Sequence, residues 1–474
     1  MKSSINQDNS MHKTNQTIKG SNQPKRIAVI GSGISSLSAA WFLGQEHEVV
    51  LFEKDSRLGG HTNTVDVYEK VGKALSIDTG FIVFNRPNYP NLTKMFKYLG
   101  VTTQNTDMSF SVSIDKGNNS KLEYSGTDLN GLFAQRSNIL SWQHWSMIGE
   151  ILRFNRLAKS QLKANSCSNM CLSDYLDKFN FSTKMREHYL LPMAAAIWSC
   201  PVETMLRFPT RSFLQFFENH GLLNIEDRPQ WETVTNGSKT YIDKILAQGN
   251  FECRLNTAVV SIEQENDQVV LHTNKGQLLV FDEVILGCHA DQAWRMMDAN
   301  LRQTFSPLAN FRYQENIAYL HCDSSLMPEK KRAWSSWNYL RDMQKQESSV
   351  AVSYWMNLLQ QLDTSIDYFV TLNPSVVPQQ DKTIKKIVYE HPVFDEAAVN
   401  SQSELCQLQG QHHIWLCGSY FGYGFHEDGL SSSVALMRLW GIDLPWERAV
   451  GFDQESSANN ADLTNQYEFE SKAS

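Results

Sequence analysis

The feature that most constrains this chain is a strand, a glycine turn and a helix near the N-terminus, followed by a second strand that ends on an acid. Gly31 allows the sharp turn, and Gly33 leaves room for a pyrophosphate to approach the backbone. The helix then directs its free N–H groups and the positive end of its dipole towards that phosphate. Glu53 ends the second strand, at the spacing of an acid that binds ribose hydroxyls. The pattern predicts a dinucleotide-binding site.

The third glycine of this turn pattern is replaced by Ser36. That position packs the helix against the strand, so it needs a small side chain, and a serine hydroxyl can bond back to a carbonyl. The alternative is a glycine-rich turn without a ligand, but strand, turn, helix and acid in register favour the dinucleotide site. The residues predicted to contact the dinucleotide here are Gly31, Gly33, Ile34, Ser35, Ser36 and Glu53.

The length and composition indicate two domains and argue against several classes of protein. A chain of 474 residues with 41% hydrophobic residues can bury more than one core. Its net charge of −8 argues against nucleic-acid binding. No apolar run reaches the ~20 residues needed to cross a bilayer, and residues 1–24 lack the apolar core of a signal peptide. We expect a cytoplasmic protein with a disordered polar lead-in over residues 1–24.

The eight cysteines are scattered along the chain and predict no zinc site. Cys167 and Cys171 lie one helical turn apart, but no second pair or histidine follows at ligand spacing. Such thiols are typical of a reducing compartment. We predict no bound metal.

Strand-like segments recur at the beginning, in the middle and near the end of the chain. Residues 254–287 alternate like a three-strand meander that ends in the short apolar strand VILG, and IWLCG from Ile414 resembles another buried strand. Residues 141–241 are mainly helical in pattern, and 109–125 resemble a hairpin. We predict an α/β fold with a Rossmann-like parallel sheet, a β-meander and an inserted, mostly helical substrate domain. The predicted ranges are 25–80, 235–300 and 405–446 for the nucleotide-binding domain, 81–234 and 301–404 for the substrate domain, and 447–474 for a polar acidic tail.

Three separated motifs together resemble one flavoprotein superfamily. They are the turn Gly31–Gly33, the segment EKDSRLGGH (Glu53–His61) and the closing segment GYGFHEDG (Gly422–Gly429). Over residues 25–446 the chain is similar to the flavin-containing amine oxidoreductases. The strings YLLPMAAAIWS, FFENHGLL, EHPVFD and YGFHEDGL resemble a branch of NAD/FAD-binding oxidoreductases encoded beside, or fused to, cyclopropane fatty-acid synthases. The resemblance implies FAD as the cofactor.

The resemblance also implies roles for the residues of these motifs. Gly59 and Gly60 bring the backbone close to the FAD pyrophosphate, and Arg57 lies near the phosphates or the ribose unless it is a surface arginine. His61 stands where the superfamily usually has an arginine, and it places an ionisable ring near the flavin. Val259 holds the adenine side through its backbone. The further residues implied to bind FAD are Lys54, Gly418, Asp428, Gly429 and Leu430.

The closing motif implies a helix that begins at Asp428 and directs its N-terminus at the pyrimidine edge of the flavin. The free N–H groups of Asp428, Gly429 and Leu430, with the helix dipole, stabilise negative charge there. Gly429 lacks a side chain where the ring approaches. The alternative is a helix that simply follows a glycine loop. A plain NAD dehydrogenase is disfavoured because this motif has no role in one.

In such enzymes the cofactor accepts hydride from a substrate C–H bond, and the protein orients the substrate and excludes water. The candidate substrate-facing residues are Tyr420, Tyr423, His426 and Trp198. The alternative is core packing for the aromatic residues and helix capping for His426. Amine oxidases use a lysine near the flavin, whereas the corresponding segment offers Arg312, which disfavours amine oxidation.

Residues 139–163 combine tryptophans with several basic residues and one acid. They can form a basic amphipathic helix that lies at an anionic lipid surface. The favoured alternative is an ordinary helix with its apolar face in the core and its charges in water.

These observations lead to one function and two alternatives. We expect FAD-dependent removal of hydride from an apolar substrate, with a methylated or cyclopropanated lipid acyl chain as the leading substrate because of the resemblance. The alternatives are a flavin amine oxidase and a non-catalytic flavin-binding partner of a lipid methyltransferase. An enzyme that acts on lipid also needs some peripheral contact with the inner face of a membrane.

Overall fold

The computed structural model describes residues 23–448, except 70–71, 73, 119, 127–128, 165, 167–169, 199–200, 225–227 and 344–350. Most of the predicted lead-in and of the acidic tail, and Cys167 of the cysteine pair, therefore lie outside the described residues.

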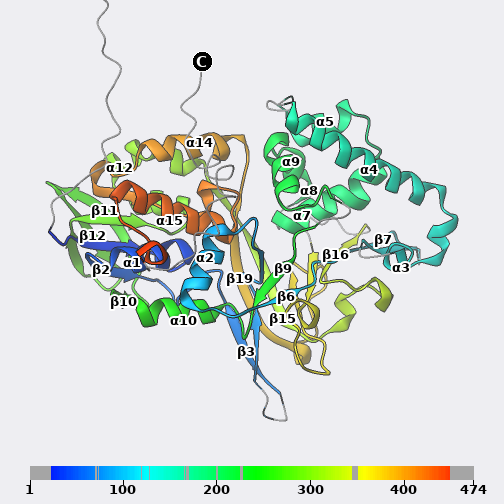
Figure 1. Cartoon of the computed structure of the whole chain (residues 1–474), viewed down its shortest axis with the longest axis horizontal. Coiled ribbons are helices and arrows are strands. Elements are labelled where there is room, and N and C mark those ends of the chain that lie inside the picture. Colours follow the sequence, from blue (N-terminus) through cyan, green and yellow to red (C-terminus); the bar gives the residue numbers. More distant parts are fainter. Residues whose placement is uncertain are drawn as a thin grey trace, which may run out of the picture.

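A five-stranded parallel sheet forms the centre of one half of the molecule (Figure 1). Its strands come from three distant stretches of the chain, as the dinucleotide pattern and the later apolar segments predict. The sheet confirms the predicted α/β fold class. The strand order is β10 (Glu252–Arg254), β2 (Glu48–Phe52), β1 (Arg26–Ile30), β14 (Glu283–Leu286) and β20 (Ile414–Leu416).

Both faces of this sheet are covered. Ile27 and Val29 of β1 pack into one core, and Ala28 and Ile30 pack into another on the opposite face. Successive side chains of a strand alternate between faces, which is why a strand buried on both sides is an unbroken apolar run. The first face carries α1 (Ile34–Leu43), α2 (Pro90–Leu99), α10 (Lys239–Gln248), α15 (His426–Trp440) and α16 (Pro445–Arg448). The second face carries the predicted meander of β11 (Val259–Glu265), β12 (Gln268–Thr273) and β13 (Leu278–Phe281), with α11 (Ala290–Met296), α12 (Ala299–Thr304) and α14 (Glu396–Gln407).

The serine in place of the third glycine is accommodated by a glycine on the neighbouring strand. A Cβ on Gly287, just after β14, would collide with the Ser36 hydroxyl oxygen. That hydroxyl bonds back to the carbonyl of Ile30 at 3.4 Å. The small residue needed between helix and sheet is therefore shared between α1 and β14.

The other half of the molecule contains a seven-stranded sheet besides the predicted helices. All of its strand pairs are antiparallel except β16 with β7, which is parallel. This pair joins the two stretches of chain that supply the sheet. The order is β19 (Thr383–Val393), β15 (Arg312–His321), β18 (Phe369–Leu372), β17 (Ala351–Trp355), β16 (Trp337–Asp342), β7 (Phe110–Asp115) and β8 (Lys121–Ser125). The last two strands form the predicted hairpin.

The helices of this half form a separate layer above the seven-stranded sheet (Figure 1). They are α4 (Trp142–Lys163), α5 (Leu172–Lys178), α6 (Thr183–Met185), α7 (Leu191–Trp198), α8 (Val202–Leu206) and α9 (Thr210–Asn219), with α3 (Leu129–Leu132) and α13 (Met356–Leu359) beside the sheet. Among the described residues, none of the helices is both long and apolar enough to span a bilayer.

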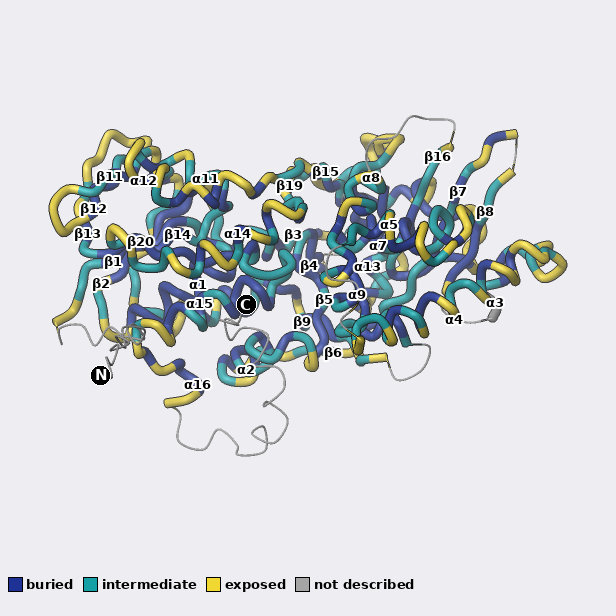
Figure 2. Tube along the Cα trace, turned by 90° about the horizontal axis from the view of Figure 1, so that it is seen from above, coloured by how far each residue is buried: buried dark blue, intermediate teal, exposed yellow. Residues whose placement is uncertain are grey.

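Small strands connect the two halves, and a continuous core runs through both (Figure 2). The connecting strands are the hairpin β3 (Thr64–Tyr68) with β4 (Ala74–Asp78), and the sheet of β5 (Val83–Asn85), β9 (Trp231–Val234) and β6 (Thr103–Thr106). Because Leu286, Leu320 and Phe213 belong to one buried cluster, the parallel sheet, the seven-stranded sheet and the helical layer share a core.

Candidate flavin-binding site

The predicted dinucleotide turn has a backbone shape that suits a phosphate. Gly31 has a φ of +98°, a conformation that favours glycine, and it lies against the backbone of Cys288. Gly33 is the N-cap of α1, so no side chain caps the N–H groups at the start of this helix. The first turn also carries no acid. A Cβ on Gly33 would meet no protein atom within 4 Å. The open space and the uncapped helix terminus fit a pyrophosphate.

Glu53 lies beside this turn, where the sequence places the ribose acid. It is buried, its carboxylate accepts hydrogen bonds from the Ser32 hydroxyl and from the backbone N–H of Asp55 (2.9 Å), and its carbonyl accepts from Thr257 (2.8 Å). The last bond ties the end of β2 to the start of β11, which is Val259. The residues predicted for the ribose and the adenine therefore lie at the same end of the sheet.

A second glycine loop lies on the first. Gly59 donates its N–H to the Ser32 carbonyl (2.9 Å), and a Cβ on Gly60 would lie 3.2 Å from the Cα of Gly33. Both glycines have positive φ values, +107° and +56°. Arg57 binds this loop itself, because its guanidinium donates to the carbonyls of Gly60 (2.7 Å) and Thr62 (3.3 Å). Lys54 is exposed just before it.

Two glycine loops stacked at an uncapped helix N-terminus, with a buried acid beside them, fit the pyrophosphate and ribose of FAD. Gly31, Gly33, Gly59, Gly60 and Glu53 would hold these parts of the cofactor. The individual residue roles stay predictions.

The closing helix begins earlier than predicted. α15 starts at His426, not at Asp428, because the Asp428 carboxylate accepts the N–H groups of Tyr423 (3.0 Å) and Phe425 (2.8 Å) and closes the first turn. We expected the N–H of Gly429 to be free. It instead donates a hydrogen bond to the Phe425 carbonyl (3.1 Å). Free N–H groups in a helix belong to its first turn, which here precedes Gly429 and Leu430.

Gly429 has a packing role that the sequence did not reveal. A Cβ there would lie 2.8 Å from the Ser35 hydroxyl oxygen and 3.0 Å from the Ile34 side chain. The hydroxyls of Ser38 and Ser433 bond at 2.6 Å farther along the same contact. The glycine thus lets α15 approach α1, and this contact holds together the two helix N-termini of the site.

Two of the four candidate substrate-facing residues lie in the core. Trp198 is buried among Phe208, Phe213 and Phe216 of the helical layer. Tyr420 is buried, its ring fills the space that a Cβ on Gly418 would need, and burial raises the pKa of its hydroxyl well above the ordinary value. The Nε1 of Trp198 and the hydroxyl of Tyr420 are buried without a hydrogen-bond partner, so the role of these two residues towards a substrate stays a prediction.

The other two candidates lie on the closing turn. His426 stacks on Phe81 with ring centroids 3.8 Å apart, and its Nε2 contacts the hydroxyls of Tyr241 (2.9 Å) and Thr62 (3.0 Å). Burial lowers the pKa of His426 to about 3, so the ring is neutral and serves to hold the loop after Gly60. Tyr423 is half-buried and faces Phe216 across 6.1 Å between ring centroids.

Three further imidazoles gather near the glycine loops, and two of them were missed from the sequence. His61 lies between Tyr389 and His391, with ring centroids 5.1 and 5.2 Å away, and its Nε2 is buried without a hydrogen-bond partner. Burial lowers the pKa of His61 to about 4 and those of His289 and His391 to about 3. All three rings are therefore neutral at pH 7, and His61 has a polar atom left for a ligand.

His289 could have been found, because it follows β14 at the carboxyl end of a parallel strand, where ligands bind in such sheets. His391 lies on β19 in the string EHPVFD, whose spacing carries no chemical signal. No group of three or more potential metal ligands occurs in the part of the chain that the structure describes.

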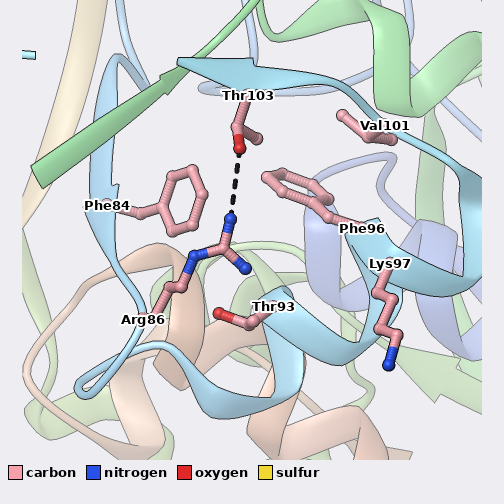
Figure 3. A pocket seen from close by; sticks show the side chains of 7 residues that line it. All are labelled: Phe84, Arg86, Thr93, Phe96, Lys97, Val101 and Thr103. Atoms are coloured by element: carbon pink, nitrogen blue, oxygen red, sulfur yellow. Dashed lines mark hydrogen bonds between the residues drawn. The ribbon is translucent and has the colours of Figure 1, made fainter. Parts of the chain in front are cut away.

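A separate small pocket, about 200 Å³ in volume, opens between α2 and β6 (Figure 3). Arg86 crosses it and forms an ion pair with Glu232 (2.5 Å). None of the predicted site residues lines this pocket, which consists of Phe84, Arg86, Thr93, Phe96, Lys97, Val101 and Thr103.

Comparison with known proteins agrees with this geometry. A curated relative, the L-amino-acid oxidase of Demansia vestigiata, is 46% identical over 48 residues, which are 10% of this chain and 9% of the relative. The match to the L-amino-acid oxidase of Pseudechis australis is 44% over 48 residues and has the same coverage. The chain thus matches less than a tenth of the length of these curated relatives.

Solved structures share the fold over nearly the whole described chain. The CLA-producing fatty acid isomerase from P. acnes has a TM-score of 0.60 at 15% identity and covers 87% of this chain and 98% of its own. Putrescine oxidase bound to putrescine has a TM-score of 0.59 at 13% identity, with 88% and 98% covered. An oxidoreductase from Methanosarcina mazei has a TM-score of 0.57 at 15% identity, with 87% and 100% covered.

One protein family matches more than half of the chain. Residues 34–327 match the family described as flavin containing amine oxidoreductase. This range begins at α1 and includes the second glycine loop, the meander and His289. The chain therefore belongs to the flavin-containing amine oxidoreductase family, and its cofactor is FAD.

Proposed function

We propose that this protein oxidises an apolar substrate with FAD, and that the substrate is a lipid acyl chain. The observation that carries the proposal is a cluster of aromatic side chains between the helical layer and the closing turn. We define Phe216, His220, Tyr423 and Phe425 as the aromatic wall. Phe216 of α9 stacks on Phe425 at 5.0 Å between ring centroids and on His220 at 3.9 Å, and it faces Tyr423. An acyl chain is held by such apolar contact, and it offers no charge to pair.

The charged groups beside this wall do not favour a cationic amine. Glu427 accepts the N–H groups of Asn91 (2.8 Å) and Leu92 (2.9 Å), and Asp428 accepts those of the closing turn. Both carboxylates are therefore engaged by backbone. Burial and the charge of Asp428 raise the pKa of the Tyr423 hydroxyl to about 12, against a smaller effect of Arg211, so this hydroxyl stays neutral.

The chemistry divides between the cofactor and the chain. Bound FAD would accept a hydride, which carries two electrons, from a substrate C–H bond, and the acyl chain would release a proton from the adjacent carbon to solvent. The aromatic wall orients the chain and excludes water, and the neutral rings of His61, His289 and His391 add no positive charge near the glycine loops.

The structural comparisons are compatible with more than one substrate class. The fold of the fatty acid isomerase from P. acnes supports an acyl substrate, and that of putrescine oxidase supports an amine. Arg312 stands in the segment that corresponds to the one with the lysine of amine oxidases. It forms an ion pair with Asp395. We therefore place the acyl chain first and amine oxidation second.

Anaerobic reduction of the purified flavoprotein tests the proposal. Loss of the flavin absorbance with phospholipids from the same cell, but not with amines, is the expected result. Bleaching by amines alone would show an amine oxidase. A flavin that no lipid or amine reduces, with an intact lipid pathway after FAD removal, would show the non-catalytic partner of a lipid methyltransferase.

A further inference from the structure

Helix α4 has an apolar face on each side. One face is buried and carries Met147, Phe154 and Ala158. The opposite face is exposed and carries Trp142, Trp145 and Leu152, which are three and seven residues apart and so form one stripe. An ordinary surface helix has only the first of these faces.

The exposed stripe continues into the turn before the helix and forms a ridge, which we define as Ile139, Leu140, Trp142 and Trp145. Leu140 is 91% exposed, Trp142 82%, Trp145 48% and Ile139 45%. The ridge lies at the end of the molecule farthest from the parallel sheet (Figures 1 and 2). A contiguous group of large apolar side chains in water marks an interaction surface.

Basic side chains lie beside the ridge, and we define Lys116, Lys184 and Arg341 as the basic cluster. The amine of Lys184 bonds to the side chain of Gln143, the neighbour of Trp142. Burial lowers the pKa of His188 most, and the charges of all three residues lower it further, to about 4. Asp115 and Asp342 lie next to Lys116 and Arg341 in the chain, and the ion pair of Asp115 is with Lys121. Three cations gathered in a chain with a net charge of −8 favour a bound anion.

Other charges of the helix belong to the fold. Glu150 accepts a hydrogen bond from the N–H of Ser182 (3.2 Å). Arg153 donates to the carbonyl of Phe179 (2.9 Å) and lies over the ring of Phe181. The helix therefore does not present its whole length as a basic face, and the free apolar surface is concentrated at its N-terminal end.

We propose that the ridge inserts into an anionic membrane surface while the basic cluster binds the lipid headgroups. Tryptophan and leucine beside lysine and arginine are the side chains that enter the boundary between headgroups and acyl chains. A second copy of this chain is a poorer partner, because a two-fold contact through the ridge would bring each basic cluster close to its counterpart. This inference stands independently of the substrate.

Sedimentation of the FAD-loaded protein with vesicles tests the proposal. We expect binding to vesicles of phosphatidylcholine with phosphatidylglycerol, weaker binding to phosphatidylcholine alone, and a decrease with salt. The double variant Leu140→Ser/Trp142→Ser should bind at least about tenfold less tightly, because it loses the large apolar side chains of the ridge. Lys184→Gln should lose about fivefold, as the loss of one basic contact predicts.

A matched control is Tyr68→Ser, which removes a side chain that is 75% exposed on β3, away from the ridge. It should leave vesicle binding unchanged. Equal binding by the ridge variant, or no binding of the parent protein to either vesicle, would overturn the proposal. So would a dimer in solution that the ridge variant dissociates, since the ridge would then contact a second copy.

Discussion

The glycine at position 33 is not required by the backbone conformation of its turn. Its φ is −65°, which any residue adopts, and no protein atom lies near the place of a Cβ. We expect Gly33→Ala to fold with unchanged stability and to bind FAD more weakly, because the methyl group occupies the place of the pyrophosphate. Crowding of this kind costs about 1–3 kcal/mol, roughly five- to 150-fold in affinity. Titration of the apoprotein with FAD measures the change.

The matched control is Gly149→Ala on the exposed side of α4, where a Cβ also meets no atom. It should leave FAD affinity unchanged and stabilise the helix by up to about 1 kcal/mol. Equal FAD affinity of both variants and the parent would contradict a pyrophosphate at Gly33.

The buried carboxyl group of Glu427 makes the free energy of unfolding decrease as the pH rises. Burial raises its pKa to about 8, although the N–H groups of Asn91 and Leu92 oppose this. A carboxyl group with a raised pKa stabilises the fold fully below its ordinary value near 4.5, and this contribution is lost as the pH rises to about 8. In Glu427→Gln the loss is absent, so the melting temperature of the variant relative to the parent should rise between pH 5 and pH 8. A constant difference, measured by thermal denaturation, would be inconsistent with this pKa.

Single residues also show what a sequence can reveal. The glycines and Glu53 could be predicted because each satisfies a local backbone or ligand requirement. The surroundings of Trp198 and Tyr420 could not, since an aromatic side chain has the same local pattern in a core and in a site wall. His391 was missed because its partners, His61 and Asn316, are distant in sequence.

The contact between α1 and α15 connects two parts of the site, and Gly429 determines how close they come. Gly429→Ala should destabilise the protein by about 1–3 kcal/mol, because the new methyl group lies 2.8 Å from the Ser35 hydroxyl oxygen. The second change Ser35→Gly removes that oxygen and should restore most of the lost stability. Denaturant unfolding of the single and double variants measures both effects.

FAD affinity of the same variants separates two roles of this glycine, with Ser35→Gly alone as the reference because Ser35 is itself predicted to contact the dinucleotide. If helix packing is its role, the double variant recovers FAD affinity together with stability. If the flavin approaches Gly429 directly, stability recovers and FAD affinity does not.

Elements were predictable where their pattern is local. The first βαβ unit, the meander and the hairpin of β7 and β8 all have strands that alternate or are uniformly apolar over neighbouring segments. The start of α15 was misplaced by two residues, since the Asp428 carboxylate that caps it comes inside the helix. The whole seven-stranded sheet could not be predicted, because some of its pairs join residues far apart in the chain, such as β7 and β16.

Acid should unfold the apoprotein through its imidazoles. The pKa values of His61, His289, His391 and His426 lie at about 3 to 4 in the fold, below the ordinary value near 6.5. Such groups stabilise the fold above pH 6.5, and this contribution is lost as the pH falls through the folded pKa. We expect the melting temperature to fall from pH 6.5 towards pH 4, less steeply in His391→Asn.

His272→Asn is the control, because that ring is half-buried on β12 beside Glu263, outside the four imidazoles named above. Its melting curve should follow the parent at every pH. An equal pH dependence in His391→Asn and the parent would show that other groups govern acid unfolding.

The arrangement of the whole molecule was partly predictable. The strands of the parallel sheet all lie inside the ranges 25–80, 235–300 and 405–446. Each buried strand is an apolar run with turns at its ends, so it can be recognised without knowledge of the other strands. The junction between the halves was not, since β5, β6 and β9 come from three places and are each four residues or fewer.

The assembly of the parallel sheet from three distant stretches has a consequence during synthesis. When a ribosome has made the first βαβ unit, the strand that flanks β14 and the helix that covers α1 are still hundreds of codons away. The nascent N-terminal segment must therefore expose apolar surface until β20 and α15 have been translated. Chains that terminate early, before Ile414, should be captured by chaperones or proteases, although they contain the complete glycine motif.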